Sequence, residues 1–415
     1  MRAPPENAAT AAALSLLSAQ AVRTRAHRML AVGLDDALPH FRVELDRLEA
    51  TVDLVLAVTR ASYPTLDVPF HSRWRHFAAG GEDRWTSLAA ATHWPDRAAR
   101  ARTAVDLAVV SVLLDAGAGP DWAYVDPRTG ARIGRSEGLA LASFDMFARG
   151  AFSERPDEPL RAGGAALARL PYETLRRGFQ VTDDNPLVAV DSRTDLLRRL
   201  GAVVTNAPHV FGRADVPRPG GLFDHLAGQA GGGSIAAGAI LSALLHDMGA
   251  IWPSRLTLGG VALGDCWRHP ALTSADATSG LMPLHKLSQW LAYSLIEPLQ
   301  AAGVAVVDVE GLTGLAEYRN GGLFIDTGVL ALRHPQDAGP AHDVSSTLVV
   351  EWRALTVALL DRLAESLRQR LGMDANALPL AKILQGGTWA AGRKLAYERA
   401  DGAPPLRVIS DGTVF

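Results

Sequence analysis

The chain has 415 residues, of which 48% are apolar and 20% charged, and its formal net charge is −3. This composition is typical of a globular protein with a large core, and the small net charge excludes a general attraction to nucleic acids or anionic membranes. The single cysteine, Cys266, excludes an intramolecular disulfide and a cysteine-based structural zinc site. We therefore expect a cytoplasmic protein that acts on a small molecule, and the length favours an enzyme. Its oligomeric state cannot be predicted from these quantities.

Residues 8–30 are predicted to form one N-terminal helix. Residues 8–21 have the length of the apolar core of a secretory signal, but Glu6 offsets Arg2 and two prolines lie between them, so we expect no signal peptide. No apolar stretch reaches the roughly 18 residues that a membrane span needs. The sequence thus predicts no membrane association.

Apolar residues recur at helical spacing along much of the chain. The run 41–59 predicts a helix that ends before Pro64, and another helix is predicted to start near Pro283. A long helix is predicted over 346–371, with Gly372 as its C-terminal stop. Shorter helices are predicted at 98–115, 137–149, 193–201, 235–247 and 389–399.

Strand signals are few and short, at 304–309, 322–326 and 406–409. Such strands among so many helices indicate small sheets or hairpins beside a helical body. Because the sequence contains neither an internal repeat nor a long linker, we expect one continuous domain over residues 1–415. The predicted fold class is mainly α with a minor β component.

The densest group of polar residues lies between residues 257 and 328. Its first part is a loop bounded by glycine and proline that contains Asp265, Trp267, Arg268 and His269. Lys286, one of only three lysines in the chain, follows on the predicted helix, on the face opposite its leucines. Acids, arginines, a lysine and aromatic surfaces together would suit a polar ligand with a charged end.

The second part of this group is the segment GLAEYRNGGLFID. Glu317, Tyr318 and Arg319 precede two glycines, and Asp326 follows in a predicted strand. The glycines predict a non-helical backbone, in which Glu317 and Arg319 would face one pocket. The same residues would also fit solvated faces, helix caps and one buried ion pair.

Two weaker patterns precede this region. The glycines of 231–234 open the predicted helix 235–247 and would allow a phosphate to bind its free amides, although flexible loops and close packing are commoner reasons for such glycines. The pair His246-Asp247 has the form of a metal-binding dyad. A histidine at the C-terminus of a helix is also favoured by the helix dipole, without any metal. We predict no metal and no cofactor.

Five segments of the chain together resemble a known family, namely 21–30, 122–147, 262–272, 281–299 and 312–330. The strings GDCWRHP and GLAEYRNGGLFID carry most of this likeness. They resemble the uracil-catabolism family of fungi and bacteria, which is a domain of unknown function, and the likeness runs from about residue 14 to Phe415. The resemblance implies a pathway in which uracil becomes a nucleotide, the ring is opened, and a ribosylurea-type intermediate yields urea.

A second likeness concerns LHKLSQWLAYSLIEPL followed by GLAEYRNGG. This layout is similar to that of queuosine salvage hydrolases, helical proteins related in fold to DNA glycosylases that cleave an N-glycosidic bond. Glu317 stands where their motif has aspartate. The resemblance therefore implies a DNA-glycosylase-like single domain and hydrolysis of the bond between ribose C1 and the urea nitrogen. We expect this hydrolysis to need no metal, because the pair His246-Asp247 has no partners that the sequence requires.

Such a cleavage builds positive charge on the sugar, which a carboxylate stabilises. Under this hypothesis Glu317 or Asp326 would stabilise that charge or orient the attacking water. Urea also leaves poorly unless it is protonated, and Asp265 or His269 would be the donor.

The remaining candidates would bind the substrate. Lys286, Arg319 and Arg268 would hold a 5′-phosphate if the sugar carries one. Trp267 and Tyr318 would cover the ribose or the planar urea. Two alternatives stay open, a uracil phosphoribosyltransferase-like step and a non-catalytic protein that binds a pathway intermediate.

Overall fold

The computed structural model describes residues 5–212, 216–252, 255–400 and 402–409. The described chain divides into two compact units, each built from segments far apart in the sequence. Helices dominate both units, and every described strand belongs to a two-stranded pair. The predicted mainly α fold with a minor β component is therefore confirmed. The likeness to DNA glycosylases and the single domain over 1–415 stay predictions.

The first unit comprises residues up to 71, 255–289 and 308–409 of the described chain. Its helices are α1 (Pro5–Ser15), α2 (Ala19–Leu34), α3 (Leu48–Ser62), α15 (Tyr318–Asp326), α16 (Thr347–Leu371), α17 (Leu380–Ile383) and α18 (Trp389–Ala400). Its strands are β1 (Phe41–Val43), β5 (Thr257–Leu258), β6 (Val261–Ala262), β7 (Cys266–Arg268), β8 (Leu281–Pro283), β10 (Leu330–Leu332), β11 (Ala341–Asp343) and β12 (Arg407–Ile409). β1 pairs with β10, β5 with β6 and β7 with β8 in antiparallel fashion, whereas β11 and β12 run parallel.

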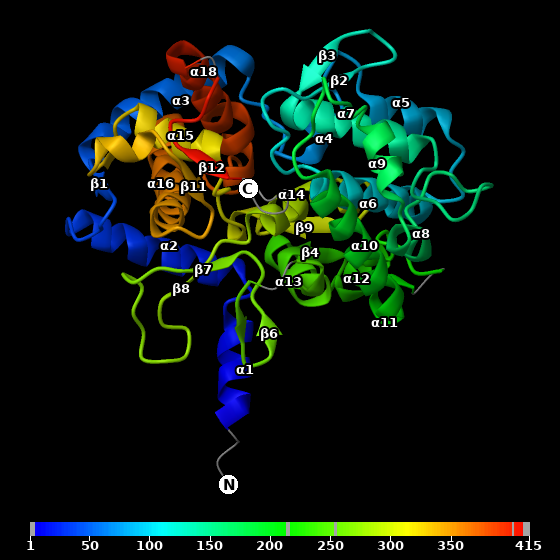
Figure 1. Cartoon of the computed structure of the whole chain (residues 1–415), viewed down its shortest axis with the longest axis horizontal. Helices are drawn as coiled ribbons and strands as arrows, with labels where there is room; N and C mark the ends of the chain where they lie inside the picture. The colour runs from blue at the N-terminus through cyan, green and yellow to red at the C-terminus, as the bar shows by residue number, and fades with distance from the viewer. Residues whose placement is uncertain (1–4, 213–215, 253–254, 401, 410–415) are drawn as a thin grey trace. The chain divides into compact units, whose positions relative to one another are not determined.

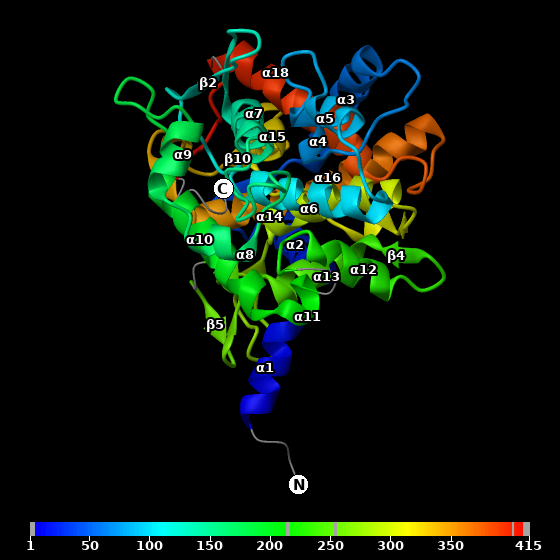
Figure 2. The ribbon, with the colours of Figure 1, turned by 90° about the vertical axis from the view of Figure 1, so that its right-hand side faces the viewer.

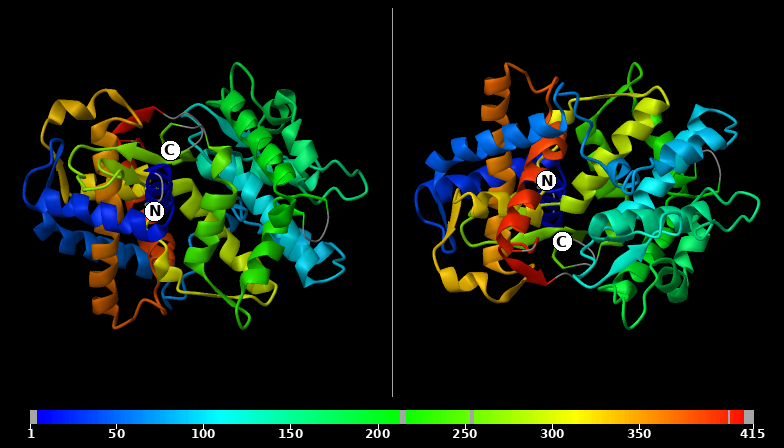
Figure 3. Two further views of the ribbon diagram at one scale, coloured as in Figure 1. Left: turned by 90° about the horizontal axis from the view of Figure 1, so that it is seen from below. Right: turned by 90° about the horizontal axis from the view of Figure 1, so that it is seen from above.

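The long helix α16 organises the core of the first unit. It packs against α2, α3 and α15, and α2 crosses it (Figures 1 and 3). The Ser346 hydroxyl accepts a hydrogen bond from the amide of Val349 at its start, and Gly372, with φ +62°, ends it in the left-handed conformation. The predicted helix over 346–371 is confirmed, because its apolar face and both end signals are local in the sequence.

Replacing Ser346 by alanine is expected to lower the free energy of unfolding by about 1 kcal/mol, since the first turn of α16 loses its side-chain cap. Urea denaturation of the purified protein measures this. The neighbouring Ser345→Ala is the control, because the Ser345 hydroxyl bonds only to Asp343 among the described contacts and caps no helix. Equal effects of the two substitutions would contradict a capping role for Ser346.

Two sequence predictions near the N-terminus are wrong. Residues 8–30 form two helices rather than one, and Ser18 caps the second by accepting a hydrogen bond from the amide of Ala21. The run 41–59 begins as the strand β1, and the helix α3 starts only at Leu48. The Phe41 amide donates to the Glu351 carboxylate at 2.8 Å, and β1 pairs with β10, so distant partners override the helical spacing.

Two further predictions fail around the candidate site. The segment 322–326 is helical, because Glu317 caps a helix that continues to Asp326. The helix predicted from Pro283 starts at Lys286, because Pro283 belongs to the hairpin strand β8. That helix, α14 (Lys286–Ala301), begins in the first unit and continues in the second.

The second unit comprises residues 72–252 and 290–307 of the described chain. Besides most of α14, its helices are α4 (Arg73–His76), α5 (Arg84–Ala91), α6 (Arg97–Leu113), α7 (Arg135–Ala148), α8 (Gly164–Ala168), α9 (Tyr172–Gly178), α10 (Val190–Asn206), α11 (Pro208–Phe211), α12 (Gly221–Gln229) and α13 (Ala237–Asp247). Its strands form an antiparallel pair, β2 (Ala123–Val125) with β3 (Arg132–Gly134), and a parallel pair, β4 (Ser234–Ala236) with β9 (Ala305–Val307).

Helices α8 and α10 pack closely in this unit (Figure 2). Gly201 of α10 permits the approach, because a Cβ at this position would lie 2.1 Å from the backbone nitrogen of Ala168. The shorter helices predicted at 98–115, 137–149, 193–201, 235–247 and 389–399 are found as α6, α7, α10, α13 and α18. The strand predictions at 304–309 and 406–409 are confirmed as β9 and β12.

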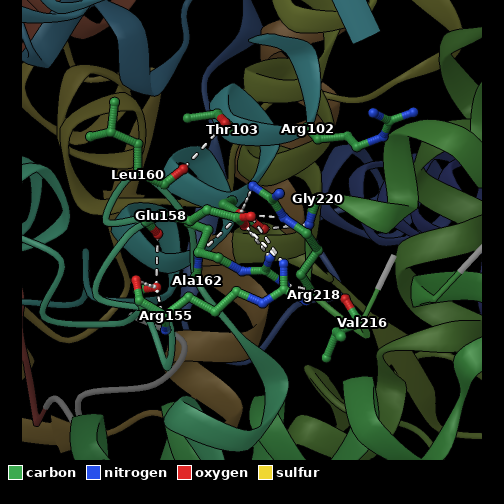
Figure 4. A network of polar contacts seen from close by, with 12 residues as sticks. Arg102, Thr103, Arg155, Glu158, Leu160, Ala162, Val216, Arg218 and Gly220 are labelled. Atoms are coloured by element: carbon green, nitrogen blue, oxygen red, sulfur yellow. Dashed lines mark hydrogen bonds and ion pairs between the residues drawn. The ribbon is translucent and has the colours of Figure 1, made fainter. Parts of the chain in front are cut away.

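A buried carboxylate on α6 ties two loops of the second unit together. Asp106, with no exposed surface, accepts hydrogen bonds from the backbone amides of Ala162 and Gly220 and from the guanidinium of Arg218 (Figure 4). The Ala162 bond is 3.0 Å long and that from Arg218 Nε is 2.8 Å. Every donor is supplied by the chain itself, so this network is structural.

Candidate functional site

Asp265 lies directly before β7 and is almost fully buried. Its two carboxylate oxygens accept from Arg353 Nη1 at 2.9 Å and Arg353 Nη2 at 2.8 Å. They also accept from Trp267 Nε1 at 2.6 Å and from the amide of Lys286 at 2.9 Å. The carboxylate thus joins the β7–β8 hairpin, the start of α14 and the N-terminal part of α16.

These contacts keep Asp265 ionised. Burial by itself would raise the pKa of its carboxyl, but the Arg353 guanidinium and the hydrogen bonds outweigh burial and lower the pKa to about 2. Since a group with this pKa holds no proton near neutrality, Asp265 is not suited to protonate a leaving group. The role of proton donor that the sequence assigned to it is therefore corrected to that of a fixed anion paired with Arg353.

Arg353 also connects this ion pair to the start of α15. Its Nε donates to the carbonyl of Ala316 at 3.2 Å, and the next residue is Glu317. Arg353 is not among the residues predicted from the sequence, because it lies within the leucine-rich run of α16, where the periodicity indicates only a core helix. An arginine directly after Trp352, ahead of the apolar stretch that ends at Leu360, is the sequence signal that could have found it.

Glu317 is the N-terminal cap of α15. Its backbone is extended, with φ −122° and ψ 164°, and its two carboxylate oxygens accept from the amides of Arg319 and Asn320, each at 2.6 Å. The residue is partly exposed, although both oxygens of its carboxylate are engaged by these amides. Burial raises the pKa of the Glu317 carboxyl. The hydrogen bonds from the two amides and the positive charge of Lys286 lower this pKa, but burial has the larger effect.

Lys286 is positioned by a strained turn. His285, immediately before it, has φ +48°, which is uncommon outside glycine, and its ring Nε2 lies 3.0 Å from the carbonyl oxygen of Leu16. The Lys286 amide bonds to Asp265, and its positive charge acts on Glu317. Lys286 is partly exposed, as is Tyr318 at the first position of α15.

The structure therefore brings together five of the nine sequence candidates. They are Asp265, Trp267, Lys286, Glu317 and Tyr318. Trp267 has a different role from the one expected, because its ring is buried beneath the Arg255 guanidinium and its Nε1 holds Asp265. We call Glu317, Lys286 and Tyr318 the accessible group of this site, since these three are partly exposed.

Arg319 lies beside the accessible group but does not point a free guanidinium at a ligand. It is 3% exposed, its Nη1 donates to the Gly402 carbonyl at 3.1 Å, and its guanidinium stacks on Tyr318 at 4.8 Å. The expected non-helical backbone, with Glu317 and Arg319 facing one pocket, is wrong because Arg319 lies in the first turn of α15. The buried arrangement corrects its role from phosphate binding to holding the C-terminal segment near Gly402.

The other candidates lie apart from Glu317. Asp326 is at the opposite end of α15, about 13 Å along the helix axis, and pairs with Arg399 at 3.7 Å. Arg268 is exposed on β7. His269 is fully buried, with its Nε2 3.3 Å from the Glu351 carboxylate, so it cannot protonate a substrate bound at the surface.

The weaker sequence patterns are not supported as sites. The glycines of 231–233 form a turn that is followed by β4, so they do not open α13, which starts at Ala237. His246 Nδ1 lies 2.8 Å from the Ser242 carbonyl oxygen, one turn earlier in the same helix. Burial raises the pKa of the Cys266 thiol to about 12, which makes it a core residue rather than a nucleophile.

The arrangement of the site is suited to electrostatic chemistry. The Glu317 carboxylate feels the positive charge of Lys286, and the ion pair of Asp265 and Arg353 holds the start of both helices through the Lys286 amide and the Ala316 carbonyl. A carboxylate and an ammonium that interact in this way can stabilise a developing positive charge on one side and an anion or a proton transfer on the other. Among the described residues, no helix has both the length and the apolar content that a bilayer span requires.

Fold and site together define a mainly α-helical protein with an ion-pair-supported carboxylate at a helix start. The chain belongs to the family described as protein of unknown function (DUF1688), which matches residues 15–415. It is 38% identical to the protein urg3 of Schizosaccharomyces pombe (strain 972 / ATCC 24843), over 96% of this chain and 98% of that one. It is 35% identical to uracil catabolism protein 4 of Lachancea kluyveri, over 91% of this chain and 92% of that one.

Proposed function

We propose that this protein is an enzyme of uracil catabolism that hydrolyses the N-ribosidic bond of a ribosylurea-type intermediate and releases urea. The pathway is supported by the name of the relative from Lachancea kluyveri, which is similar over nearly its whole length. The observation that supports the reaction is Glu317, a partly exposed residue on whose carboxylate the positive charge of Lys286 acts.

The proposed reaction needs one water. As the bond between ribose C1 and the urea nitrogen breaks, positive charge grows on the sugar, and the Glu317 carboxylate stabilises it. Glu317 then takes a proton from the water whose oxygen bonds to C1. Lys286 gives a proton to the departing urea nitrogen and recovers it from Glu317, so that no proton is gained or lost by the enzyme.

Lys286 takes this role because the other sequence candidates for a donor are held elsewhere. Asp265 has a pKa of about 2, to which Arg353 lowers it against the effect of burial, and His269 is enclosed against Glu351. Lys286 is partly exposed, and its positive charge acts on Glu317. Whether its ammonium also contacts a 5′-phosphate is answered by comparing ribosylurea with its 5-phosphate as substrates.

We expect the purified full chain to release urea from synthetic N-ribosylurea or its 5-phosphate, measured with a urease-coupled assay. Binding of ribosylurea without release of urea would contradict hydrolysis and leave a binding protein. Release of pyrophosphate from uracil and phosphoribosyl pyrophosphate would instead support a transferase. The described strands give no structural support to the transferase, since they form only two-stranded pairs instead of the usual parallel sheet.

The pH dependence of this activity follows from the pKa of Glu317. Burial raises that pKa above the value of about 4.3 that glutamate ordinarily has, so Glu317 ionises only at a higher pH. Because the reaction uses the ionised carboxylate, kcat/KM is expected to rise with pH along an acid limb whose midpoint lies above 4.3. The acid limb should be absent from the residual activity of Glu317→Gln, and an unchanged limb in that variant would assign the titration to another group.

A further inference from the structure

A cavity of about 160 Å³ lies in the second unit, outside the candidate site. It is bounded by α4, α5, α6 and the C-terminal half of α14. Its apolar walls are formed by Trp74, Trp85, Ala101, Ala104 and Pro298. Trp74 and Trp85 contact each other with ring centroids 5.3 Å apart, so the cavity offers an aromatic surface.

The volume limits the size of an occupant. An apolar cavity of about 150 Å³ in another protein holds one benzene molecule. A cavity of about 160 Å³ therefore accommodates a single six-membered ring, and a larger ligand would extend out of it into solvent.

The polar lining adds two available cations. Arg97 and Arg100 lie in the exposed first turn of α6, and in the described part of the chain neither guanidinium has a hydrogen bond or an ion pair. Arg75, in contrast, donates to Glu297 at 2.6 Å. Arginines that line an aromatic cavity without a protein partner are suited to bind an anionic group.

The acidic groups of the lining are already engaged. The Glu297 carboxylate accepts from Arg75 and from the hydroxyl of Ser72, at 2.6 Å in each case. Asp83 caps α5 by accepting from the amide and the hydroxyl of Thr86. With Arg75 and Glu297 paired, the lining keeps the two positive charges of Arg97 and Arg100 and the negative charge of Asp83, so a net positive charge remains for an anionic ligand.

We propose that this cavity binds one planar six-membered ring that carries an anionic substituent, a carboxylate or a phosphate. The ring contacts the surface formed by Trp74 and Trp85, and the anionic group contacts Arg97 and Arg100. This proposal does not depend on the hydrolase function, because none of its residues belongs to the candidate site.

The test is isothermal titration calorimetry of the full chain with four probes. Benzoate and phenyl phosphate carry the two anionic groups, benzamide is a neutral ring, and cyclohexanecarboxylate is an anion without a planar ring. We expect at least one of the two aromatic anions to bind, and to bind about tenfold or more tightly than benzamide and cyclohexanecarboxylate, as charge-assisted contacts and stacking predict. Binding of benzoate alone identifies a carboxylate ligand, and binding of phenyl phosphate alone identifies a phosphate.

Variants locate the binding in the cavity. The double substitution Arg97→Ala and Arg100→Ala changes only exposed side chains, so the variant is expected to melt like the wild type. Its affinity for the aromatic anion is expected to fall by about tenfold or more. Arg132→Ala, an exposed arginine of β3 in the same unit, is the matched control and should bind normally.

The proposal is overturned if neither aromatic anion binds, if benzamide or cyclohexanecarboxylate binds as tightly, or if the double variant binds like wild type. Urea release is measured separately, so a failure here leaves the hydrolase proposal unaffected.

Discussion

Replacing Glu317 by glutamine is expected to lower the turnover of ribosylurea by about 10² to 10⁴, the range found when one electrostatic or acid–base group is removed. Glutamine keeps the size of the side chain and one carbonyl oxygen for the cap of α15. It removes the charge that, in the proposed reaction, stabilises ribose C1 and accepts the proton of water. Urea release per folded molecule, with the folded fraction taken from circular dichroism, measures the effect.

The cap of α15 gives Glu317 a structural role that must be separated from catalysis. Both of its carboxylate oxygens bond to amides of the first helical turn. Glu317→Asp is the matched variant, because aspartate is among the best N-cap residues and keeps the charge, but its carboxylate is one carbon closer to the backbone. Catalysis predicts that Glu317→Asp melts like the wild type and still loses turnover.

Two outcomes would contradict the catalytic role. If turnover in both variants falls only in proportion to the unfolded fraction, Glu317 acts as a helix cap. If a well-folded Glu317→Gln protein turns over like the wild type, the carboxylate is not part of the mechanism, and Lys286 loses the partner that positions it in the proposal.

The elements that sequence reasoning predicted best are those with local signals at both ends. The helix over 346–371 has its apolar stripe, Ser346 and Gly372 within one continuous stretch, and the structure agrees within one residue. The strand β1 could not be predicted in this way, because its partners are β10 and Glu351, some 300 residues later in the chain. An apolar pattern therefore indicates burial more reliably than it indicates the type of element.

The candidate site shows the same limit. Asp265, Lys286 and Glu317 could be found because their residue types cluster around glycines and prolines in a region otherwise rich in apolar residues. Arg353, the partner of Asp265, could not, because it is 88 residues from Asp265 and lies within a core helix. Sequence alone also cannot tell a free arginine from a buried one, and the role first given to Arg319 fails for that reason.

The ion pair between Asp265 and Arg353 is expected to be the most sensitive point of the first unit. Asp265→Asn should lower the free energy of unfolding by about 3–5 kcal/mol, because it leaves the Arg353 guanidinium buried without its anion. Arg353→Met should have a comparable effect by leaving the carboxylate unpaired. The double variant should cost clearly less than the sum of the two, since no buried charge remains without a partner. Urea denaturation of the four proteins measures this cycle, with Asp53→Asn, from a pair at the surface, as a control of much smaller effect.

The same pair predicts a pH dependence with a definite sign. Arg353 and the hydrogen bonds lower the pKa of Asp265 to about 2 against the opposing effect of burial, whereas an aspartate in the unfolded chain titrates near 3.9. The folded protein then holds fewer protons than the unfolded chain between these values, so the stabilisation from ionised Asp265 is fully present above about pH 4 and is lost as the pH falls toward 2.

Other carboxylates titrate in this range as well, so the quantity to measure is the difference in unfolding free energy between the wild type and Asp265→Asn. That difference is expected to be constant above about pH 4.5 and to shrink below about pH 4. A difference that stayed constant down to pH 2 would show that Asp265 is not the ionised partner of Arg353 and would remove the rigid base on which the position of Glu317 and Lys286 depends.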